Sequence, residues 1–386
     1  MANMEHALRT VTDRIAAARA DGTPLCLRGG GSKDFLGVAR GERLDTRTLS
    51  GVISYEPTEL VVTVGAGTPL AELEALLAGQ GQCLAFEPQH YRWSVPGESP
   101  ATVGGMVASG LAGPSRASVG GVRDYVLGVK LINGLGQHLT FGGQVMKNVA
   151  GYDVSRLMVG ARGTLGLLTE ISLKVLPVAP AEATLCFELE QHDALEHLHR
   201  WGGEPLPLNA SCWVMDDSTP GAPAKPSLYV RLRGAVAAVE AACKKMLAEV
   251  PGQRMDNAQT RPDWGLCRNQ QLPFFTARPQ PDSVLWRISV PQTAPVLGLP
   301  GHPLVEWHGG LRWLWAPIAA GAELQALAHA AGGNATLFVN PADAAQTSGA
   351  RSSDALRSDS KSLNAISLRL KASFDPQGLF NPGLVS

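Results

Sequence analysis

Closely spaced cysteines are missing from this sequence of 386 residues. Zinc ribbons and self-contained iron–sulfur sites need such spacing for their thiolate ligands, so the sequence excludes both. Scattered cysteines are instead typical of free thiols in a reducing compartment. The six cysteines stand alone, with no C-x-x-C pair, at Cys26, Cys83, Cys186, Cys212, Cys243 and Cys267.

Long apolar runs and a large net charge are lacking as well. No run comes near the roughly 18 consecutive apolar residues that a membrane-spanning helix needs. The N-terminal stretch MANMEHALRTVTDRIAAARADG carries charges throughout and has no apolar signal-peptide core. The formal net charge of −1 gives no electrostatic footprint for nucleic acid. We therefore expect a cytoplasmic protein with no transmembrane segment and no nucleic-acid partner.

Glycine and proline are abundant instead, with 43 and 27 residues spread along the chain. This distribution predicts many tight turns rather than one disordered tract. Apolar spacing predicts a first helix that ends at Asp21 and Gly22, followed by a strand at 24–28. Further along, it predicts a helix with Thr68 as its N-cap and a hairpin that turns at Asn133 and Gly134. Helices and strands thus mix from the start of the chain.

The stretch PLCLRGGGSKDFLG, residues 24–37, places three glycines after a short strand and an arginine. Three consecutive glycines lose much conformational entropy on folding. One interpretation is a plain surface loop, which tolerates three glycines but needs neither the preceding strand nor Arg28. The other interpretation is a loop whose N–H groups meet an anion, usually a phosphate, with help from Ser32 and Lys33. It is not a Rossmann turn or a P-loop, because both motifs are absent.

Two more glycine-rich segments lie in the first half of the chain. Residues 99–113 combine small residues with Val103, Met106 and Val107 at helix-like spacing, whereas a flexible linker would be more polar. GARGTLG, residues 160–166, is the other. Backbone with few side chains permits close approach of a flat ligand. Each segment alone is a weak signal, but three in one α/β region indicate one large ligand.

Four segments resemble the PCMH-type FAD-binding fold of the vanillyl-alcohol oxidase superfamily, and most of all the FAD-binding subunits of bacterial glycolate oxidases. They are LRGGGSKDFLG, SPATVGGMVASGLAGPSRASVGGVRDYVLGVKLINGLG, KNVAGYDVSRLMVGARGTLGLLTEISLKV and FDPQGLFNPG. The resemblance implies an α+β protein. A PCMH-type FAD-binding domain of two α/β subdomains would span 1–178, a smaller α+β cap domain 179–345, and a C-terminal segment, 346–386, would return to the FAD domain.

Carried over by position, the resemblance also implies a set of FAD-binding residues. The pyrophosphate loop would consist of Arg28, Gly29, Gly30, Gly31, Ser32 and Lys33. The segment beside the pyrophosphate and the flavin ring would supply Ala101, Thr102, Gly104 and Gly105. Further contacts along the cofactor would come from Ala108, Gly110 and Gly113. The adenine side and its ribose would be covered by Gly163, Gly166 and Ile171.

Departures from the superfamily pattern limit the chemistry. Members with covalently bound flavin often place a histidine beside the triple glycine, and this chain has none between Arg28 and Gly37, so noncovalent FAD is expected. The H-x-G-D-G-N-x-H run of hydroxyacid-oxidising relatives is missing too. His197 and His199 lie two apart on a predicted helix and point to different faces. We therefore expect no metal, and ordinary polar or capping roles for these two, His302 and His308.

No catalytic residue is assigned from the sequence. Four residues of the KNVAGYD region are interpreted as stapling a loop near the flavin: Lys147, Tyr152, Asp153 and Arg156. Four arginines on predicted cap strands are expected to be exposed: Arg231, Arg233, Arg287 and Arg312. Most of the eight tryptophans are expected in the core, with some share at a subunit contact.

The resemblance implies a flavoprotein subunit of a glycolate oxidase complex. Its FAD would pass electrons between a catalytic flavoprotein subunit and an iron–sulfur subunit, toward the membrane quinone pool. Glycolate, a small 2-hydroxy acid, would become glyoxylate, and the partners would hold the chain at the inner face of the cell membrane. Two alternatives stay open: a self-sufficient FAD-dependent 2-hydroxyacid dehydrogenase, and a non-catalytic structural subunit that has lost the cofactor.

Overall fold

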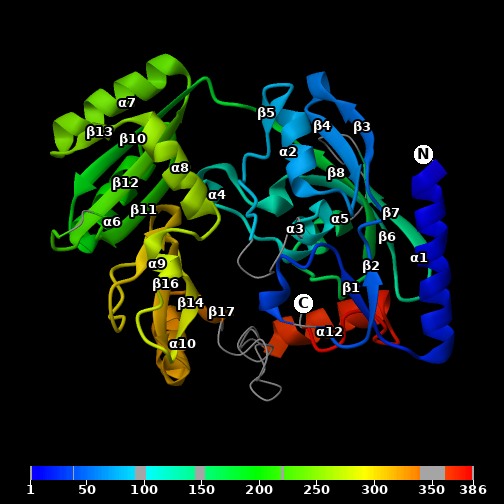
Figure 1. Cartoon of the computed structure of the whole chain (residues 1–386). Helices are drawn as coiled ribbons and strands as arrows, with labels where there is room; N and C mark the ends of the chain where they lie inside the picture. The colour runs from blue at the N-terminus through cyan, green and yellow to red at the C-terminus, as the bar shows by residue number, and fades with distance from the viewer. Residues whose placement is uncertain are drawn as a thin grey trace. The chain divides into compact units, whose positions relative to one another are not determined.

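The computed structural model describes residues 2–37, 39–91, 101–143, 153–218, 221–339 and 361–384. The chain divides into two compact units (Figure 1). The first unit comprises Met1–Leu111, Gly121–Val178 and Ser348–Ser386, and the second comprises Ala112–Gly120 and Ala179–Thr347. The expectations for Lys147 and Tyr152 lie outside the described residues.

The first unit mixes short helices with a sheet and two strand pairs. Its helices are α1 Ala2–Asp21, α2 Leu70–Ala78, α3 Val103–Ser109, α5 Val154–Leu157 and α12 Lys361–Phe374. Its strands are β1 Leu25–Arg28, β2 Glu42–Asp45, β3 Val52–Glu56, β4 Val61–Gly65, β5 Gln82–Cys83, β6 Val126–Ile132, β7 His138–Gly142, β8 Leu167–Lys174 and β9 Leu176–Pro177. Short 3₁₀ turns interrupt the loops at Asp34–Leu36, Pro57–Glu59 and Val122–Asp124.

The main sheet of this unit has the order β3-β4-β8-β6-β7, and every neighbouring pair is antiparallel. The predicted hairpin between β6 and β7 is confirmed. The Asn133 side-chain oxygen accepts hydrogen bonds from the N–H groups of Leu135 at 3.0 Å and Gln137 at 2.9 Å, and so closes the turn. Separately, β1 and β2 form a parallel pair.

The apolar stripe of α1 packs against β1 and the C-terminal segment. Val11, Ile15 and Ala18 lie at helical spacing and are buried, as predicted. They share one core cluster with Leu25 of β1 and with Phe380, and these last two residues form an isolated parallel bridge. The two ends of the chain therefore meet at the strand that leads into the glycine loop.

The second unit is one large sheet with helices on both faces. Its helices are α4 Arg116–Val119, α6 Gln191–Gly202, α7 Val236–Glu249, α8 Asn257–Arg268, α9 Pro273–Thr276 and α10 Gly321–Ala330. Its strands are β10 Ala181–Glu188, β11 Leu208–Asp216, β12 Lys225–Gly234, β13 Gln253–Met255, β14 Ser283–Ser289, β15 Leu304–Glu306, β16 Leu311–Pro317 and β17 Asn334–Val339. Its 3₁₀ turns are Trp307–Gly309 and Ile318–Ala320.

All eight strands of this sheet run antiparallel to their neighbours, in the order β13-β10-β12-β11-β15-β16-β14-β17. Alternate residues face opposite sides. Leu185 of β10 and Val230 of β12 pack under α6 and α7, and Trp286 of β14 packs under α10. Thr184, the neighbour of Leu185, faces the other side, where it accepts a hydrogen bond from Trp264 of α8. Helices α8 and α9 therefore belong to the opposite face.

Some local expectations are wrong. Pro69, not Thr68, caps α2, because the Thr68 hydroxyl accepts a hydrogen bond from the Gly51 N–H instead. Arg231 and Arg312 are buried rather than exposed. Arg231 donates to the Asn209 side chain at 2.7 Å, and Arg312 donates to the Ala294 carbonyl at 2.9 Å.

Other expectations are confirmed. Six of the tryptophans are buried, at Trp201, Trp213, Trp264, Trp286, Trp307 and Trp313. All six cysteines are free thiols. Among the described helices, none combines the length and apolar character needed to span a membrane.

Candidate cofactor site

The glycine loop is shaped by an ion pair at its start. Arg28, the last residue of β1, donates to the Asp34 carboxylate through Nε at 2.8 Å and Nη2 at 2.6 Å. The guanidinium lies over Gly31, whose φ is +78°. A Cβ at Gly31 would collide with this guanidinium, and the backbone angle disfavours other residues as well. The ion pair thus requires a glycine at the centre of the loop.

The second glycine-rich segment packs directly on the first. A Cβ on Gly29 would lie 2.5 Å from the Thr102 hydroxyl oxygen, so only glycine permits this contact. Thr102 caps α3 and accepts a hydrogen bond from the Gly105 N–H at 3.1 Å. On the far side, the Gly104 N–H donates to the Ala66 carbonyl at 2.7 Å, which fixes the start of α3 against the β4–α2 connection.

The third glycine-rich segment closes on the end of α3. The N–H groups of Gly160 and Arg162 donate to the carbonyls of Val107 at 3.0 Å and Ala108 at 2.8 Å. Asn381, near the C-terminus, then ties this segment to β1. Its side chain donates to the Arg162 carbonyl at 2.7 Å and accepts from the Leu27 N–H at 2.7 Å. The three segments therefore converge in one place.

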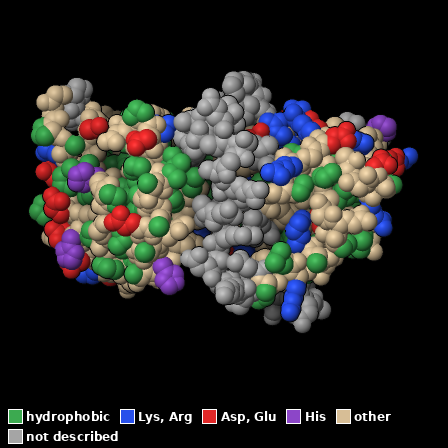
Figure 2. All heavy atoms as spheres, turned by 90° about the horizontal axis from the view of Figure 1, so that it is seen from below, with side chains coloured by type: hydrophobic (Ala, Val, Ile, Leu, Met, Phe, Trp, Pro, Cys, Tyr) green, Lys and Arg blue, Asp and Glu red, His purple; other side chains and the backbone are tan. Residues whose placement is uncertain are grey.

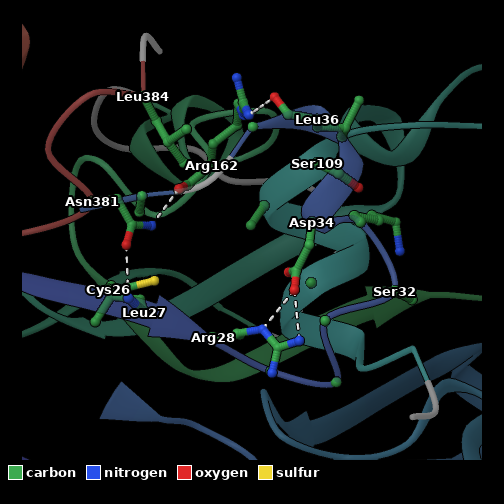
Figure 3. A pocket seen from close by; sticks show the side chains of 18 of the residues that line it. Cys26, Leu27, Arg28, Ser32, Asp34, Leu36, Ser109, Arg162, Asn381 and Leu384 are labelled. Atoms are coloured by element: carbon green, nitrogen blue, oxygen red, sulfur yellow. Dashed lines mark hydrogen bonds and ion pairs between the residues drawn. The ribbon is translucent and has the colours of Figure 1, made fainter. Parts of the chain in front are cut away.

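A cavity of about 160 Å³ lies where they meet (Figure 3). This volume suits a group of roughly ten non-hydrogen atoms, such as the pyrophosphate portion of a dinucleotide. Figure 3 shows the Arg28–Asp34 pair on one side and the Asn381–Arg162 contact on another. The lining residues that the sequence predicted are Arg28, Gly29, Gly30, Gly31, Ser32, Lys33, Thr102, Gly105 and Ala108.

Lys33 is the residue of this cavity whose surroundings call most clearly for a ligand. Its Nζ is buried and makes no hydrogen bond to any residue within the described ranges. It lies 5.8 Å from the centre of the Tyr91 ring. Burial lowers its pKa to about 8, because the charged ammonium is removed from water. A buried, unpaired ammonium is strongly unfavourable unless an anion joins it.

Burial shifts the pKa of two further groups of the cavity. The Arg162 guanidinium donates to the Leu36 carbonyl, and burial lowers its pKa. Burial, and secondarily the charge of Asp34, raises the pKa of the Cys26 thiol. The cavity thus presents cationic groups and a thiol that stays protonated.

Comparison with known proteins identifies the family. Residues 7–142 match the family model of the FAD binding domain. Over 378 residues the chain is 42% identical to the glycolate oxidase subunit GlcE of Escherichia coli (strain K12), covering 97% of this chain and 96% of the relative. The chain belongs to the GlcE family. The PCMH-type, α+β fold class predicted from the sequence is confirmed, and FAD is the cofactor indicated for the chain.

Two other proteins are similar to this GlcE-family chain. The glycolate oxidase subunit GlcD of Bacillus subtilis (strain 168) is 31% identical over 176 residues, which cover 46% of this chain and 35% of the relative. A solved structure of alkyldihydroxyacetonephosphate synthase, in crystal form P1, gives a TM-score of 0.64 at 15% identity, covering 96% of this chain and 75% of that one. The second likeness is one of fold alone.

Other predicted site residues of the GlcE-family chain support the cavity without lining it. Gly110, at φ +63°, ends α3, and Gly163 lies against the Asn381 side chain. Gly166 packs on the Ile132 carbonyl, and Ile171 is buried in β8 between β4 and β6. Ala101 accepts a hydrogen bond from the Leu70 N–H through its carbonyl.

Gly113 belongs to the second unit, where its carbonyl accepts a hydrogen bond from the Trp307 indole at 2.9 Å. Asp153 and Arg156, expected to staple a loop, form an ion pair at 2.8 Å at the start of α5.

Sequence reasoning missed three residues that shape the cavity: Asp34, Arg162 and Asn381. Asp34 and Arg162 stand inside two glycine-rich segments already singled out, and Asn381 stands in the FDPQGLFNPG segment. Arg162 and Asn381 adopt a positive φ, of +52° and +46° respectively. No spacing in the sequence signals that Asn381 contacts residues far earlier in the chain.

Proposed function

We propose that this chain is the FAD-binding subunit of a glycolate oxidase complex. Its FAD would pass electrons from a catalytic flavoprotein subunit toward an iron–sulfur subunit and a quinone, while glycolate becomes glyoxylate. The first unit would serve as the cofactor domain and the second as the cap. The nearly full-length match to GlcE supports this assignment, and GlcD bears the name of a second subunit of the same enzyme.

The observation that carries the proposal is the buried Lys33 ammonium, which makes no hydrogen bond to a described residue, in a cavity where three glycine-rich segments meet. The pyrophosphate of FAD supplies the anion that this group lacks. Gly29, Gly30, Gly31 and Ser32 line the same cavity. When bound, FAD supplies a two-electron acceptor, and the chain supplies its orientation and a site from which water is excluded.

The described cavity lining supports a proposal of noncovalent attachment. Among the described residues that line it, none is a histidine. Cys26 does line it, but burial raises the pKa of its thiol and keeps it a poor nucleophile. We therefore propose that FAD is released intact when the protein is denatured.

Heating or acid precipitation of the purified chain tests the cofactor. We expect free FAD in the supernatant at about one equivalent per chain. A colourless chain would contradict the proposal that the protein binds FAD. Flavin that stays with the precipitate would contradict noncovalent attachment.

Anaerobic addition of glycolate separates a relay subunit from a self-sufficient dehydrogenase. Alone, the chain should keep its oxidised flavin spectrum. In the presence of the co-expressed partner subunits, its flavin should bleach. Rapid bleaching of the isolated chain would instead identify a self-sufficient 2-hydroxyacid dehydrogenase.

A further inference from the structure

The second unit contains a cavity that the proposed function does not use. Its volume is about 840 Å³, which lies within the range of pockets that hold small organic molecules. We call it the cap cavity. It lies on the sheet face that carries α8 and α9, and its floor includes Cys212 and Val214 of β11, Tyr229 of β12 and Trp315 of β16.

Two hydrogen bonds attach the roof of the cap cavity to its floor. The Trp264 indole of α8 donates to the Thr184 hydroxyl of β10 at 3.0 Å. The Trp315 indole of β16 donates to the Phe274 carbonyl of α9 at 2.7 Å. Because α8 and α9 are each hydrogen-bonded to the sheet at a separate point, the fold itself keeps the space between these helices and the sheet open. The aromatic rings leave most of its wall apolar.

Carboxylates dominate the ionisable groups around this apolar space, beside one histidine, His302. Three carboxylates line the cavity, from Asp216, Asp217 and Asp263, whereas no lysine or arginine does among the described residues. Asp217 and Asp263 are exposed and mark the mouth, while Asp216 accepts a hydrogen bond from the Tyr229 hydroxyl further in. Burial, and next the charge of Asp216, raises the pKa of Asp263, so these two carboxylates repel each other.

One buried cation of this unit contacts the aromatic wall from outside the cavity. Arg231 stacks on the Trp264 ring at 4.7 Å, but it is buried, bonds to Asn209 and does not line the cavity. Figure 2 shows the second unit, on the left of that view, with hydrophobic and acidic side chains and few lysines or arginines. Small carboxylates and phosphates are therefore disfavoured in the cap cavity.

We propose that the cap cavity binds an apolar molecule that carries one positively charged amine. The apolar body lies between Trp264, Phe274 and Trp315, and the amine faces the carboxylates at the mouth. This site is separate from the FAD cavity in residues and in charge, so it is a second binding function of the chain. It does not depend on the proposed role in glycolate oxidation.

Calorimetric titration of the purified full-length chain tests the proposal with three probes of matched size: phenylbutylamine, phenylbutanol and phenylbutyrate. We expect the amine to bind roughly five- to tenfold more tightly than the alcohol at low salt, since partly desolvated carboxylates favour a cation. The acid should bind most weakly. Equal affinity for all three probes, or preference for the acid, overturns the proposal.

Variants then assign the charge preference. Replacing Asp217 and Asp263 together by asparagine should bring amine affinity down to that of the alcohol and leave alcohol affinity unchanged. The matched control replaces two exposed acidic residues of α6, Asp193→Asn with Glu196→Gln, on the opposite face of the same sheet. This control should keep the preference. If the control loses it, or the first variant keeps it, the amine does not bind at these carboxylates and the proposal fails.

Fluorine NMR of the fluorotryptophan-labelled chain locates the probe. Phenylbutylamine should shift the Trp315 resonance, assigned with Trp315→Phe, and leave that of Trp201 in place, since Trp201 is a buried residue of α6, on the other face of the sheet. A shift of Trp201 alone contradicts the location. FAD content, measured on each sample, reports independently on the proposed function.

Discussion

The side-chain amide of Asn381 donates a hydrogen bond of 2.7 Å to the backbone carbonyl of Arg162, 219 positions earlier in the chain. The same side chain accepts from the Leu27 N–H at 2.7 Å. One amide therefore joins β1, the third glycine-rich segment and the C-terminal tail. Because Asn381 is buried, water does not replace either bond when the side chain is changed.

Replacing Asn381 by leucine should destabilise the chain and loosen its FAD. Two half-buried backbone groups lose their side-chain partner, at up to about 1–3 kcal/mol each. We expect a lower urea midpoint and faster loss of flavin on dialysis. Asn334→Leu, at an exposed start of a strand, is the matched control and should change neither. An Asn381→Leu chain with native stability and FAD content would refute the role of this contact.

Lys33 should oppose stability and favour cofactor binding. Its pKa is lowered by burial from 10.5 to about 8, so between these values the unfolded chain holds a proton that the folded chain does not. The free energy of unfolding of the FAD-free protein should therefore rise with pH across that window. Below pH 8 the buried ammonium is charged, and its full burial cost lowers the stability. At neutral pH, Lys33→Met should stabilise the FAD-free chain by about 3 kcal/mol. Urea unfolding measures this, with exposed Lys244→Met as control.

The affinity for FAD should depend on pH through the same group. The ammonium of Lys33 supplies attraction to the pyrophosphate only while it is protonated, so affinity should fall as pH rises above about 8. Fluorescence titration of FAD into the stripped protein at several pH values measures the effect. In Lys33→Met the affinity should be lower at neutral pH and nearly flat through this range. A wild-type profile that stays flat from neutral pH upward would show that Lys33 does not hold the cofactor.

Gly31 should tolerate no side chain. Alanine there needs an unfavourable positive φ and collides with the Arg28 guanidinium, so the Arg28–Asp34 pair must open. We expect Gly31→Ala to weaken FAD binding about tenfold or more, because a loss of about 1.4 kcal/mol of binding free energy lowers the affinity tenfold. Gly221→Ala has the same φ of +78° but meets no described atom within 4 Å, and it controls for backbone strain. Equal FAD affinity in the two variants would mean that the loop is not part of the site.

His308 should make the second unit sensitive to acid. Its ring nitrogens lie 2.9 Å from the Ser118 hydroxyl and 3.0 Å from the Ser211 hydroxyl, and burial lowers its pKa to about 4. In the unfolded chain His308 is protonated below about pH 6.5, whereas in the folded chain it stays neutral down to about pH 4. The free energy of unfolding is therefore highest above pH 6.5 and decreases as the pH falls toward 4. The loss should reach about 3 kcal/mol. Denaturant unfolding of wild type and His308→Gln over this range should show the slope only in the wild type.

Local features of the sequence were sufficient to predict several of the helices and turns. The apolar stripe of α1, the turn at Asn133 and the spacing of Val103, Met106 and Val107 each depend on neighbours within a few residues, and all three appear as predicted. The glycine segments were recognisable for the same reason, because a missing side chain is visible in the sequence itself.

What the tertiary structure alone decided is which groups meet. Asn381 bonds to Arg162, Arg231 packs against the Trp264 ring, and the Lys33 ammonium is buried without a hydrogen bond to any described residue. Each outcome depends on segments far apart in the chain. Burial and charge pairing are properties of that assembly, since the free energy of an ionised group depends on everything packed around it. The sequence by itself determined that this chain has glycine-rich loops suited to FAD, and the packing determined where its unpaired charge and its second cavity lie.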